Sequence, residues 1–287
     1  MTHAVVLTAE AGVSDAAAVA VASALEQAGA RILSERRLGP AGYEIGMDRA
    51  VGPPVLEGCD INLVRMEGRE KRLLIADMDS TMIPVECIDE LADFAGVKDR
   101  VSAITEAAMA GEFDFEGALR ARVALLEGLG EDVLQRCYDE RISLNPGARA
   151  LVRTMAERGA VTALVSGGFT FFTSRVAREA GFHHNQANTL LFEGSVLTGT
   201  VGEPILGREA KRTALEHFCA EGGFGPDDVV AVGDGANDLA MVEAAGLGVA
   251  YRAKAALRAK ADAVLDHSDL TAILHLQGIP EADFVTG

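Results

Sequence analysis

Short apolar runs alternate with longer stretches of helical periodicity through most of the chain. The runs at 73–76, 161–165, 229–232 and 248–251 have the length and composition of buried strands, and the first of these strands is expected to span 72–77. Helical patterns such as 208–220 separate them. Strands and helices that alternate in this way indicate a parallel sheet covered by helices on both faces. The pattern therefore predicts an α/β fold with a Rossmann-like, doubly wound sheet.

A different pattern interrupts this sheet between residues 85 and 144. Apolar residues recur at helical spacing and predict four helices, at 86–95, 99–110, 115–126 and 131–142. An all-helical insert after the first core strand is typical of a cap over the strand ends, where a lid expels water and contacts substrate. The catalytic core is then expected to comprise 67–84 and 145–287, with βα alternation continuing to its end.

The amino-terminal residues 1–66 form a third unit with its own pattern. A strand at 4–7, an alanine-rich helix at 15–28 and strands at 31–37 and 43–51 predict a small β-α-β-β domain of the α+β type. Gly52-Pro53-Pro54 predicts a linker after it. The unit carries no catalytic cluster. It is vaguely similar to amino-acid-sensing modules of metabolic enzymes, and a packing or dimerisation element, including a homodimer, is equally compatible with it.

Acidic residues follow two of the predicted core strands. Asp77 and Asp79 come directly after the first, and two positions apart on an extended segment their side chains point the same way. Two like charges aimed at one spot are costly unless a cation lies between them, and hard oxygen ligands favour Mg²⁺. Asp234 and Asp238 repeat this arrangement after the strand at 229–232. Because carboxyl ends of parallel strands share one edge of a sheet, the two clusters can converge there.

Groups that suit an anion lie between the two acidic clusters. Ser166 offers a hydroxyl, and Gly167 and Gly168 free backbone N–H groups at the end of the strand at 161–165. Lys211, on the helix at 208–220, can hold a phosphate by its charge. Each signal alone is more often a turn, a loop or a solvated helix face. Their joint occurrence at converging strand ends favours a functional site.

Other motifs fit the residues poorly. An EF-hand loop starting at Asp77 needs glycine at 82 and glutamate at 88, where Met82 and Ile88 stand. The chain has no Gly-Lys pair and therefore no Walker A loop. The order Ser166, Asp234, His267 matches an α/β-hydrolase triad, but Leu164 occupies the position where a nucleophile elbow needs glycine.

The motif residues resemble the haloacid dehalogenase superfamily of phosphohydrolases. Asp77-Met78-Asp79-Ser80-Thr81, Ser166, Lys211 and the segment 233–238 are similar to its four ordered motifs. The segments 86–90, 115–123 and 165–169 resemble the phosphoserine phosphatases within it. The resemblance covers about 72–274 and leaves the amino-terminal unit outside.

This resemblance implies hydrolysis of O-phospho-L-serine to L-serine and phosphate, the last step of L-serine biosynthesis, through an aspartyl-phosphate. It implies that Asp77 is the nucleophile and Asp79 the general acid and base. It further implies that Mg²⁺ is held by the Asp77 side chain, the Asp79 backbone carbonyl and Asp234, with Asp238 in support.

The same resemblance implies a set of substrate-binding residues. Ser166, the Gly167 amide and Lys211 would hold the phosphoryl oxygens, and Asn237 would help to orient the site. Glu86 and Arg122 match the substrate-selecting residues, since a carboxylate can bind an ammonium and a guanidinium can grip a carboxylate. Met109 and Phe115 are expected on the apolar side of the lid or in its core.

Two further functions remain compatible with the sequence. A sister phosphatase for another small phosphate ester would keep the core residues and change Glu86 or Arg122. A non-enzymatic amino-acid sensor built on residues 1–66 would need neither Asp77 nor Asp79.

Composition favours a cytoplasmic enzyme with a small-molecule substrate. Lys and Arg number 26 against 43 Asp and Glu, and the net charge of −17 without a basic patch disfavours nucleic acid and anionic membranes. The four cysteines lack CxxC or zinc spacing and are expected to be free thiols. No signal peptide is expected, because Glu10 and Asp15 interrupt the amino terminus, and the uncharged stretch 16–25 is too short to span a membrane.

Overall fold

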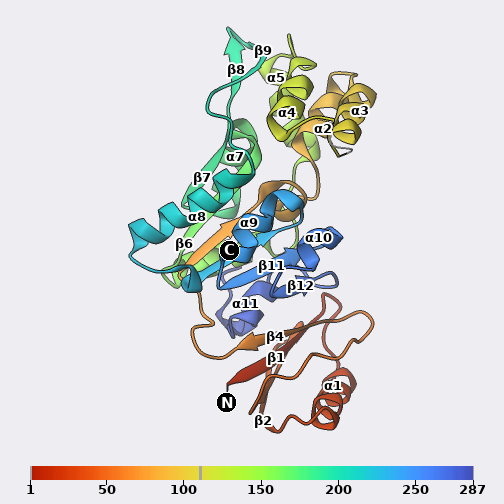
Figure 1. Ribbon diagram of the computed structural model, residues 1–287, viewed down its shortest axis with the longest axis vertical. Coiled ribbons are helices and arrows are strands. Elements are labelled where there is room, and N and C mark those ends of the chain that lie inside the picture. Colours follow the sequence, from red (N-terminus) through yellow and green to blue (C-terminus); the bar gives the residue numbers. More distant parts are fainter. Residues whose placement is uncertain (1, 110–111, 287) are drawn as a thin grey trace.

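The computed structural model describes residues 2–109 and 112–286, apart from the side chain of Met109. The molecule is elongated and has three tiers along its long axis (Figure 1). A small domain built from the amino-terminal strands lies at one end, a parallel α/β core in the middle and a helical cap at the other end. The predicted fold class is confirmed.

The core is a six-stranded parallel sheet in the order β12-β11-β10-β5-β6-β7. Its strands are β5 (Leu73–Ala76), β6 (Val161–Phe169), β7 (His184–Asn188), β10 (Val229–Gly233), β11 (Leu247–Tyr251) and β12 (Ala263–Leu265). From β5 the chain adds β6 and β7 on one side and β10 to β12 on the other. Such a change of direction opens a crevice at the carboxyl ends of the adjacent strands, where α/β sheets bind ligands.

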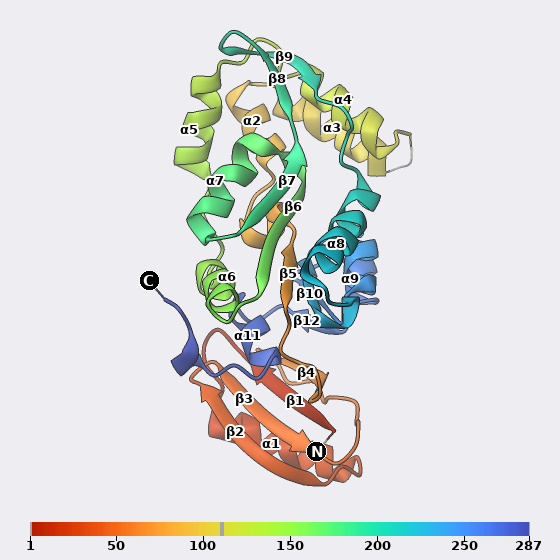
Figure 2. The ribbon, with the colours of Figure 1, turned by 90° about the vertical axis from the view of Figure 1, so that its left-hand side faces the viewer.

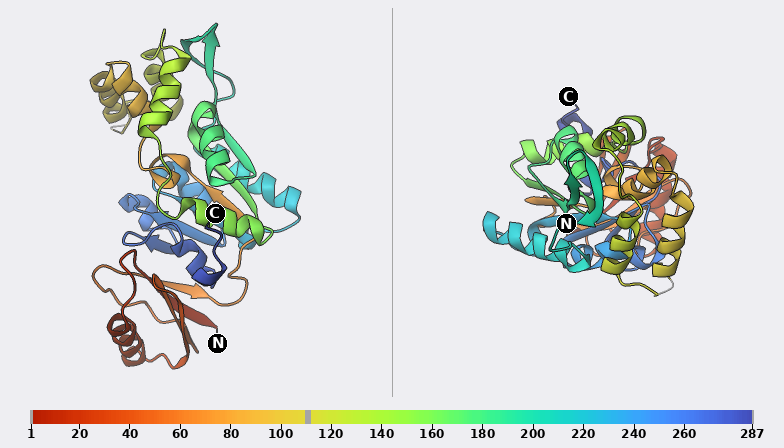
Figure 3. Two further views of the ribbon diagram at one scale, coloured as in Figure 1. Left: turned by 180° about the vertical axis from the view of Figure 1, so that it is seen from behind. Right: turned by 90° about the horizontal axis from the view of Figure 1, so that it is seen from above.

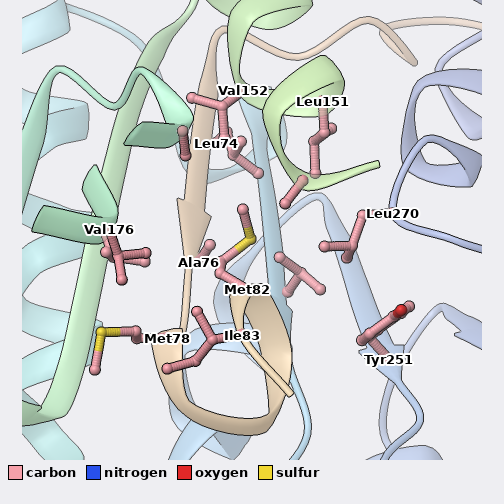
Figure 4. Packing of buried hydrophobic residues seen from close by; sticks show 14 of the residues in the cluster. Leu74, Ala76, Met78, Met82, Ile83, Leu151, Val152, Val176, Tyr251 and Leu270 are labelled. Carbon is pink, nitrogen blue, oxygen red and sulfur yellow. The ribbon is translucent and has the colours of Figure 1, made fainter. Parts of the chain in front are cut away.

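Helices cover both faces of this sheet. One layer contains α6 (Ala148–Glu157), α7 (Thr170–Ala180) and α11 (Ala272–Leu276), and the other contains α8 (Arg208–Gly222), α9 (Leu239–Ala244) and α10 (Ala255–Arg258). Successive residues of β5 point to opposite layers. Leu74 and Ala76 pack near Leu151 and Val152 of α6 (Figure 4), whereas Leu73 and Ile75 pack in the other layer. Burial on both faces explains why β5 is an unbroken apolar run.

The cap consists of the four helices that the sequence predicts. They are α2 (Cys87–Phe94), α3 (Lys98–Met109), α4 (Phe115–Ala124) and α5 (Glu131–Arg141). The chain enters the cap after the irregular turn η1 (Met78–Met82) and leaves it at Asn145, whose backbone N–H donates to the Met82 carbonyl at 2.8 Å. The two connections to the core therefore lie side by side.

The expected βα alternation is wrong after β7. There β8 (Leu190–Glu193) and β9 (Val196–Val201) form an antiparallel hairpin that rises beside the cap (Figure 2). Its tip bonds to the cap through three backbone hydrogen bonds, between Gly128 and Leu197, Leu197 and Leu129, and Glu131 and Ser195, at 2.8 to 2.9 Å. The hairpin is thus a second support of the cap, besides its own chain connections.

The amino-terminal domain is a four-stranded antiparallel sheet with one helix. Its strands β1 (His3–Thr8), β2 (Ile32–Gly39), β3 (Gly42–Met47) and β4 (Asp60–Arg65) lie in the order β2-β3-β1-β4, and the helix is α1 (Asp15–Gln27). The sequence did not predict β4. Because β4 pairs with β1, Gly52-Pro53-Pro54 lies in a loop inside this sheet and the predicted linker there is wrong.

Both faces of this small sheet are covered (Figure 3). Val5, Leu7, Ile45 and Met47 pack on one face with Val21 and Leu25 of α1. On the other face Ala4, Val6, Leu38 and Val64 join the core cluster that includes the α11 residues Ile273 and Leu274. The core thus supplies the second layer that a single-helix sheet lacks.

Polar groups bridge the seam between this domain and the core. Asn62 pairs with the backbone of Val264 through hydrogen bonds of 2.9 and 3.0 Å, and Asp60 accepts the backbone N–H groups of Asp266 and His267. Arg69 forms an ion pair with Glu44 of β3 at 2.5 Å and donates to the carbonyls of His275 and Leu276. The domain is therefore fixed to the core by specific buried bonds.

Two further expectations concern the environment of the chain. All four cysteines have free thiols. Within the described ranges, no helix combines the length and apolar character needed to cross a bilayer.

Candidate active site

Asp77 and Asp79 lie at the carboxyl end of β5 and face one cavity. The Asp77 N–H donates to the Val232 carbonyl of β10 at 3.0 Å, which ties the turn to the neighbouring strand. Ser80 follows with a φ of 56°, a left-handed conformation that non-glycine residues rarely adopt. Both carboxylates are buried and line the same cavity, as their spacing predicted.

The Asp79 carboxylate is held at both of its oxygens. Oδ1 accepts the Cys87 N–H at 2.9 Å, and Oδ2 accepts the Ser166 hydroxyl at 3.3 Å. Burial, and then the negative charge of Glu86, raise the pKa of Asp79 to about 6. A carboxyl group with this pKa can both give and take a proton near neutral pH.

The Ser166-Gly167-Gly168 segment belongs to β6, which continues to Phe169 instead of ending at Val165 as expected. Its pairing with β7 is irregular between Val165 and Phe169, so the backbone turns toward the cavity. The Gly168 N–H donates to Ser166 Oγ at 2.8 Å. A Cβ at Gly168 would lie 2.8 Å from Asp79 Oδ2, so this close approach requires glycine.

The second acidic cluster meets Asp77 around one lysine. Lys211 Nζ of α8 lies 2.5 Å from both Asp77 Oδ1 and Asp238 Oδ1. The other oxygen of Asp238 accepts the N–H groups of Asp234 and Gly235 at 3.1 and 3.0 Å. Ligand atoms of Asp77, Asp234 and Asp238 all lie within 4.8 Å of one another.

The charges in this cluster do not balance. Burial, and then the charge of Asp238, raise the pKa of Asp77 well above its ordinary value and that of Asp234 to about 6. Burial opposes the charge of Lys211, but Asp77 and Asp238 outweigh it and raise the lysine pKa. Lys211 pairs with Asp77 and Asp238, and the charges of Lys254 and Lys211 act on Asp234, so two ammonium groups face these three carboxylates together with Asp79 and Glu86 of the same cavity. An oxygen-only donor set with excess negative charge suits a hard divalent cation.

A cavity of about 390 Å³ lies between the acidic residues Asp77, Asp79 and Asp234 of the core and the helices of the cap. Glu86, Phe115 and Arg122 line it from the cap side. Glu86 Oε1 accepts the Ser80 hydroxyl at 2.9 Å, and Arg122 Nε donates to the Ala118 carbonyl at 3.2 Å.

Phe115 closes the cavity against the core. Its ring lies beside Gly167 and Gly207, where an added Cβ would approach it within 3.2 and 3.5 Å. Asn237 lines the cavity from the core side, whereas Lys211 lies buried below its floor. The side chain of Met109 lies outside the described residues.

Sequence reasoning missed several lining residues. Asp89 and Thr105 contribute from the cap, and Lys254 contributes from the start of α10. The Lys254 N–H donates to the Asp234 carbonyl at 2.9 Å, a contact that no local pattern signals. Asp89 follows Glu86 by three residues, so the helical spacing of the two carboxylates was the signal for it.

The hydrolase-triad alternative is wrong. His267 is exposed beside the amino-terminal domain, and its N–H donates to Asp60. It does not line the cavity that holds Ser166 and Asp234.

The doubly wound core, the four motif segments at its strand ends and the inserted cap define a class of hydrolases. The profile of the haloacid dehalogenase-like hydrolases matches residues 74–243. The chain belongs to this family.

Similar proteins within the family include several phosphoserine phosphatases. One from Archaeoglobus fulgidus is 46% identical over 212 residues, which are 74% of this chain and 61% of that relative, so this chain spans less than two thirds of the relative's length. A solved structure described as a phospho-aspartyl intermediate analogue of phosphoserine phosphatase has 39% identity and a TM-score of 0.66, covering 72% of this chain and 98% of that one.

A solved structure also matches the amino-terminal domain. The probable phosphoserine phosphatase from Vibrio cholerae, in its unliganded form, has 31% identity and a TM-score of 0.82. The alignment covers 98% of this chain and 88% of that chain. The three-tier arrangement is therefore shared with a known structure.

Proposed function

We propose that this protein is a phosphoserine phosphatase, which hydrolyses O-phospho-L-serine to L-serine and phosphate as the last step of L-serine biosynthesis. One observation carries the proposal. A single cavity holds Asp77 and Asp79 on its core side and Glu86 and Arg122 on its cap side. The similarity to named phosphoserine phosphatases over the core and cap supports it.

The reaction begins with Asp77 as nucleophile. Lys211, 2.5 Å away, favours the ionised carboxylate and fixes its position. A carboxylate oxygen of Asp77 bonds to phosphorus while the bond from phosphorus to the serine oxygen breaks, and the product is an aspartyl-phosphate. This route divides one difficult displacement into two easier ones.

Asp79 handles the proton in both steps. In the first step its carboxyl group gives a proton to the departing serine oxygen. In the second it takes a proton from the water that attacks phosphorus and releases phosphate from Asp77. Its raised pKa, to about 6, supports this double role. The bonds from Cys87 and Ser166 hold the group in place for both steps.

We assign Mg²⁺ as the cofactor. The side chains of Asp77 and Asp234 would hold it, with the Asp79 backbone carbonyl as a further ligand. Asp238 would act in support, because Lys211 and two backbone N–H groups already occupy its oxygens. When bound, the ion supplies positive charge that offsets the carboxylates and polarises a phosphoryl oxygen.

The remaining residues bind the two ends of the substrate. Ser166, the Gly167 amide and Lys211 would hold phosphoryl oxygens, and Asn237 would orient the site. At the other end, Arg122 would grip the α-carboxylate and Glu86 would attract the ammonium. The guanidinium of Arg122 and the carboxylate of Glu86 thus provide opposite charges for the carboxylate and the ammonium of an amino acid.

The test is phosphate release from O-phospho-L-serine in the presence of Mg²⁺. Asp77→Asn keeps the side-chain shape but removes the attacking charge, so turnover should fall to background while the circular dichroism spectrum stays unchanged. Asp228→Asn is the matched control, since that carboxylate lies outside the cavity and pairs with Arg72 at 3.9 Å. Near wild-type turnover by Asp77→Asn would overturn the mechanism. Wild-type protein that leaves phosphoserine intact would overturn the proposed substrate.

A cytoplasmic location is part of the same proposal. The four free thiols, three of them buried, suit a reducing compartment.

A further inference from the structure

The cap carries a second carboxylate on the cavity wall, that of Asp89. Glu86 is the N-cap of α2 and has an extended backbone, and Asp89 lies three residues later in the first turn of this helix. Both residues line the cavity. The Asp89 N–H donates to the Glu86 carbonyl at 3.1 Å, which keeps the two residues in register within the first helical turn.

The two carboxylates differ in what they contact. Glu86 Oε1 already accepts a hydrogen bond from the Ser80 hydroxyl, which belongs to the turn Met78–Met82 that follows β5. Within residues 2–109 and 112–286, the Asp89 carboxylate has no hydrogen bond or ion pair. An acceptor that lines a cavity without a protein partner is available to a ligand.

Arg122 presents the opposite charge in the same cavity. Its Nε donates to Ala118, and across the described part of the chain its guanidinium forms no ion pair. Burial lowers the pKa of Arg122, and among the charges that oppose this effect Asp89 is stronger than Glu86. The Asp89 carboxylate and the Arg122 guanidinium therefore act on each other across the cavity that both line, but within the described residues they form no ion pair with each other.

An α-amino acid carries its ammonium and carboxylate on the same carbon. A ligand of this kind can pair with Arg122 through its carboxylate and with Asp89 through its ammonium at once. We propose that Asp89 is a specificity-determining residue that binds the α-ammonium group of the substrate beside the α-carboxylate held by Arg122. The inference rests on the proposed function and deepens it, because it adds a second ammonium-binding carboxylate to Glu86.

The test compares two ligands that differ in the ammonium group. One is O-phospho-L-serine, and the other is 3-phosphooxypropionate, which has hydrogen in place of the ammonium. Binding of the second is measured as competitive inhibition, so it needs no turnover. Asp89→Asn keeps the volume of the side chain and removes its charge. Loss of one charge-assisted hydrogen bond should raise KM for phosphoserine by about 10-fold to 100-fold, with kcat within about 2-fold.

The inhibition constant of 3-phosphooxypropionate should stay the same or fall in Asp89→Asn, since this ligand has no ammonium to lose. Asp93→Asn is the matched control, because it lies one turn further along α2, is exposed and pairs with Arg141 at 3.4 Å. It should change neither ligand. Asp89→Ala provides a second variant with the same expected pattern should Asp89→Asn fold poorly.

The outcomes separate this inference from the function on which it rests. Equal weakening of both ligands would show that Asp89 positions Arg122 or α2, and would overturn the inference. An unchanged KM for phosphoserine would overturn it as well. Absence of phosphoserine turnover in the wild-type protein, by contrast, would refute the proposed function itself.

Discussion

The buried ion pair between Glu44 and Arg69 allows a sharp test of how the amino-terminal domain is held. Glu44 Oε2 lies 2.5 Å from Arg69 Nη1, with side-chain exposures of 4% and 8%. Arg36 adds a contact of 3.2 Å to the other oxygen of Glu44. Burial lowers the pKa of Arg69, and the charge of Glu44 is what chiefly opposes this effect. Glu44→Ala would leave the guanidinium buried without a counter-charge.

The expected loss of stability follows from that burial. Removing one partner of a buried pair costs about 3–5 kcal/mol. Arg69 keeps hydrogen bonds to the carbonyls of His275 at 3.1 Å and Leu276 at 3.2 Å, so we expect the lower end, about 3 kcal/mol. At about 2–4 °C per kcal/mol for a chain of this size, Tm should fall by about 6–12 °C.

The assay is thermal unfolding followed by circular dichroism, together with kcat/KM for phosphoserine. Activity at 25 °C should not change, because the pair joins β3 of the amino-terminal domain to the core, whereas residues of the core and the cap line the cavity. The amino-terminal domain and the cap lie at opposite ends of the molecule (Figure 1). Glu35→Ala is the matched control, since Glu35 is exposed on β2 and accepts the Tyr43 hydroxyl at 3.1 Å. It should cost less than about 0.5 kcal/mol. A Tm loss no larger than that of Glu35→Ala would refute the reasoning.

Further outcomes are expected from the site and the seam. Arg122→Ala should lower kcat/KM for phosphoserine at least ~30-fold, because the α-carboxylate of the substrate loses its partner at a cost of about 2–5 kcal/mol. The kcat/KM for phosphoethanolamine, which has no carboxylate, should fall far less, and equal losses on both substrates would contradict this reasoning. Exhaustive chelation with EDTA should abolish phosphate release and lower Tm, and added Mg²⁺ should restore both. Ca²⁺ should not restore turnover, because it takes more ligands at longer distances than Mg²⁺ does. Full activity after chelation would exclude a metal role. Burial lowers the pKa of His275 in the folded protein. Below about pH 6.5, the ordinary pKa of histidine, the unfolded chain therefore binds a proton that the folded protein does not bind, and the free energy of unfolding should decrease as the pH falls through this value. His275→Gln should reduce that slope of Tm between pH 7.5 and 5.5 and the exposed His217→Gln should not; identical slopes would refute the assignment.

The positions of strands that are buried on both faces could be predicted from the sequence. In β5 and β10 all residues are buried, so each strand is an unbroken apolar run followed at once by its carboxylates. The motif residues stand directly at these strand ends, and the run therefore places them on the correct edge of the sheet.

β4 was missed because two of its three buried positions are polar, whereas only Val64 is apolar. Asp60 and Asn62 are buried, and they bond to the backbone of β12 and of the residues after it, so polar side chains occupy positions where an apolar pattern is expected. A pattern of apolar residues cannot reveal a strand whose buried side chains serve an interface between domains. The same limit applies to Lys254, whose position in the cavity depends on a contact with a strand end distant in sequence.

The hairpin of β8 and β9 has a consequence for how the cavity opens. Two chain connections that lie side by side would make a single hinge, free to swing. The backbone bonds at Leu197 and Ser195 add a third attachment, so the cap can move only if these bonds break or the hairpin travels with it. In the second case the residues after β9 must bend as well, and they lead directly into the first turn of α8, where Lys211 lies. A movement of the cap would then be mechanically coupled to the position of Lys211, the residue proposed to bind phosphate.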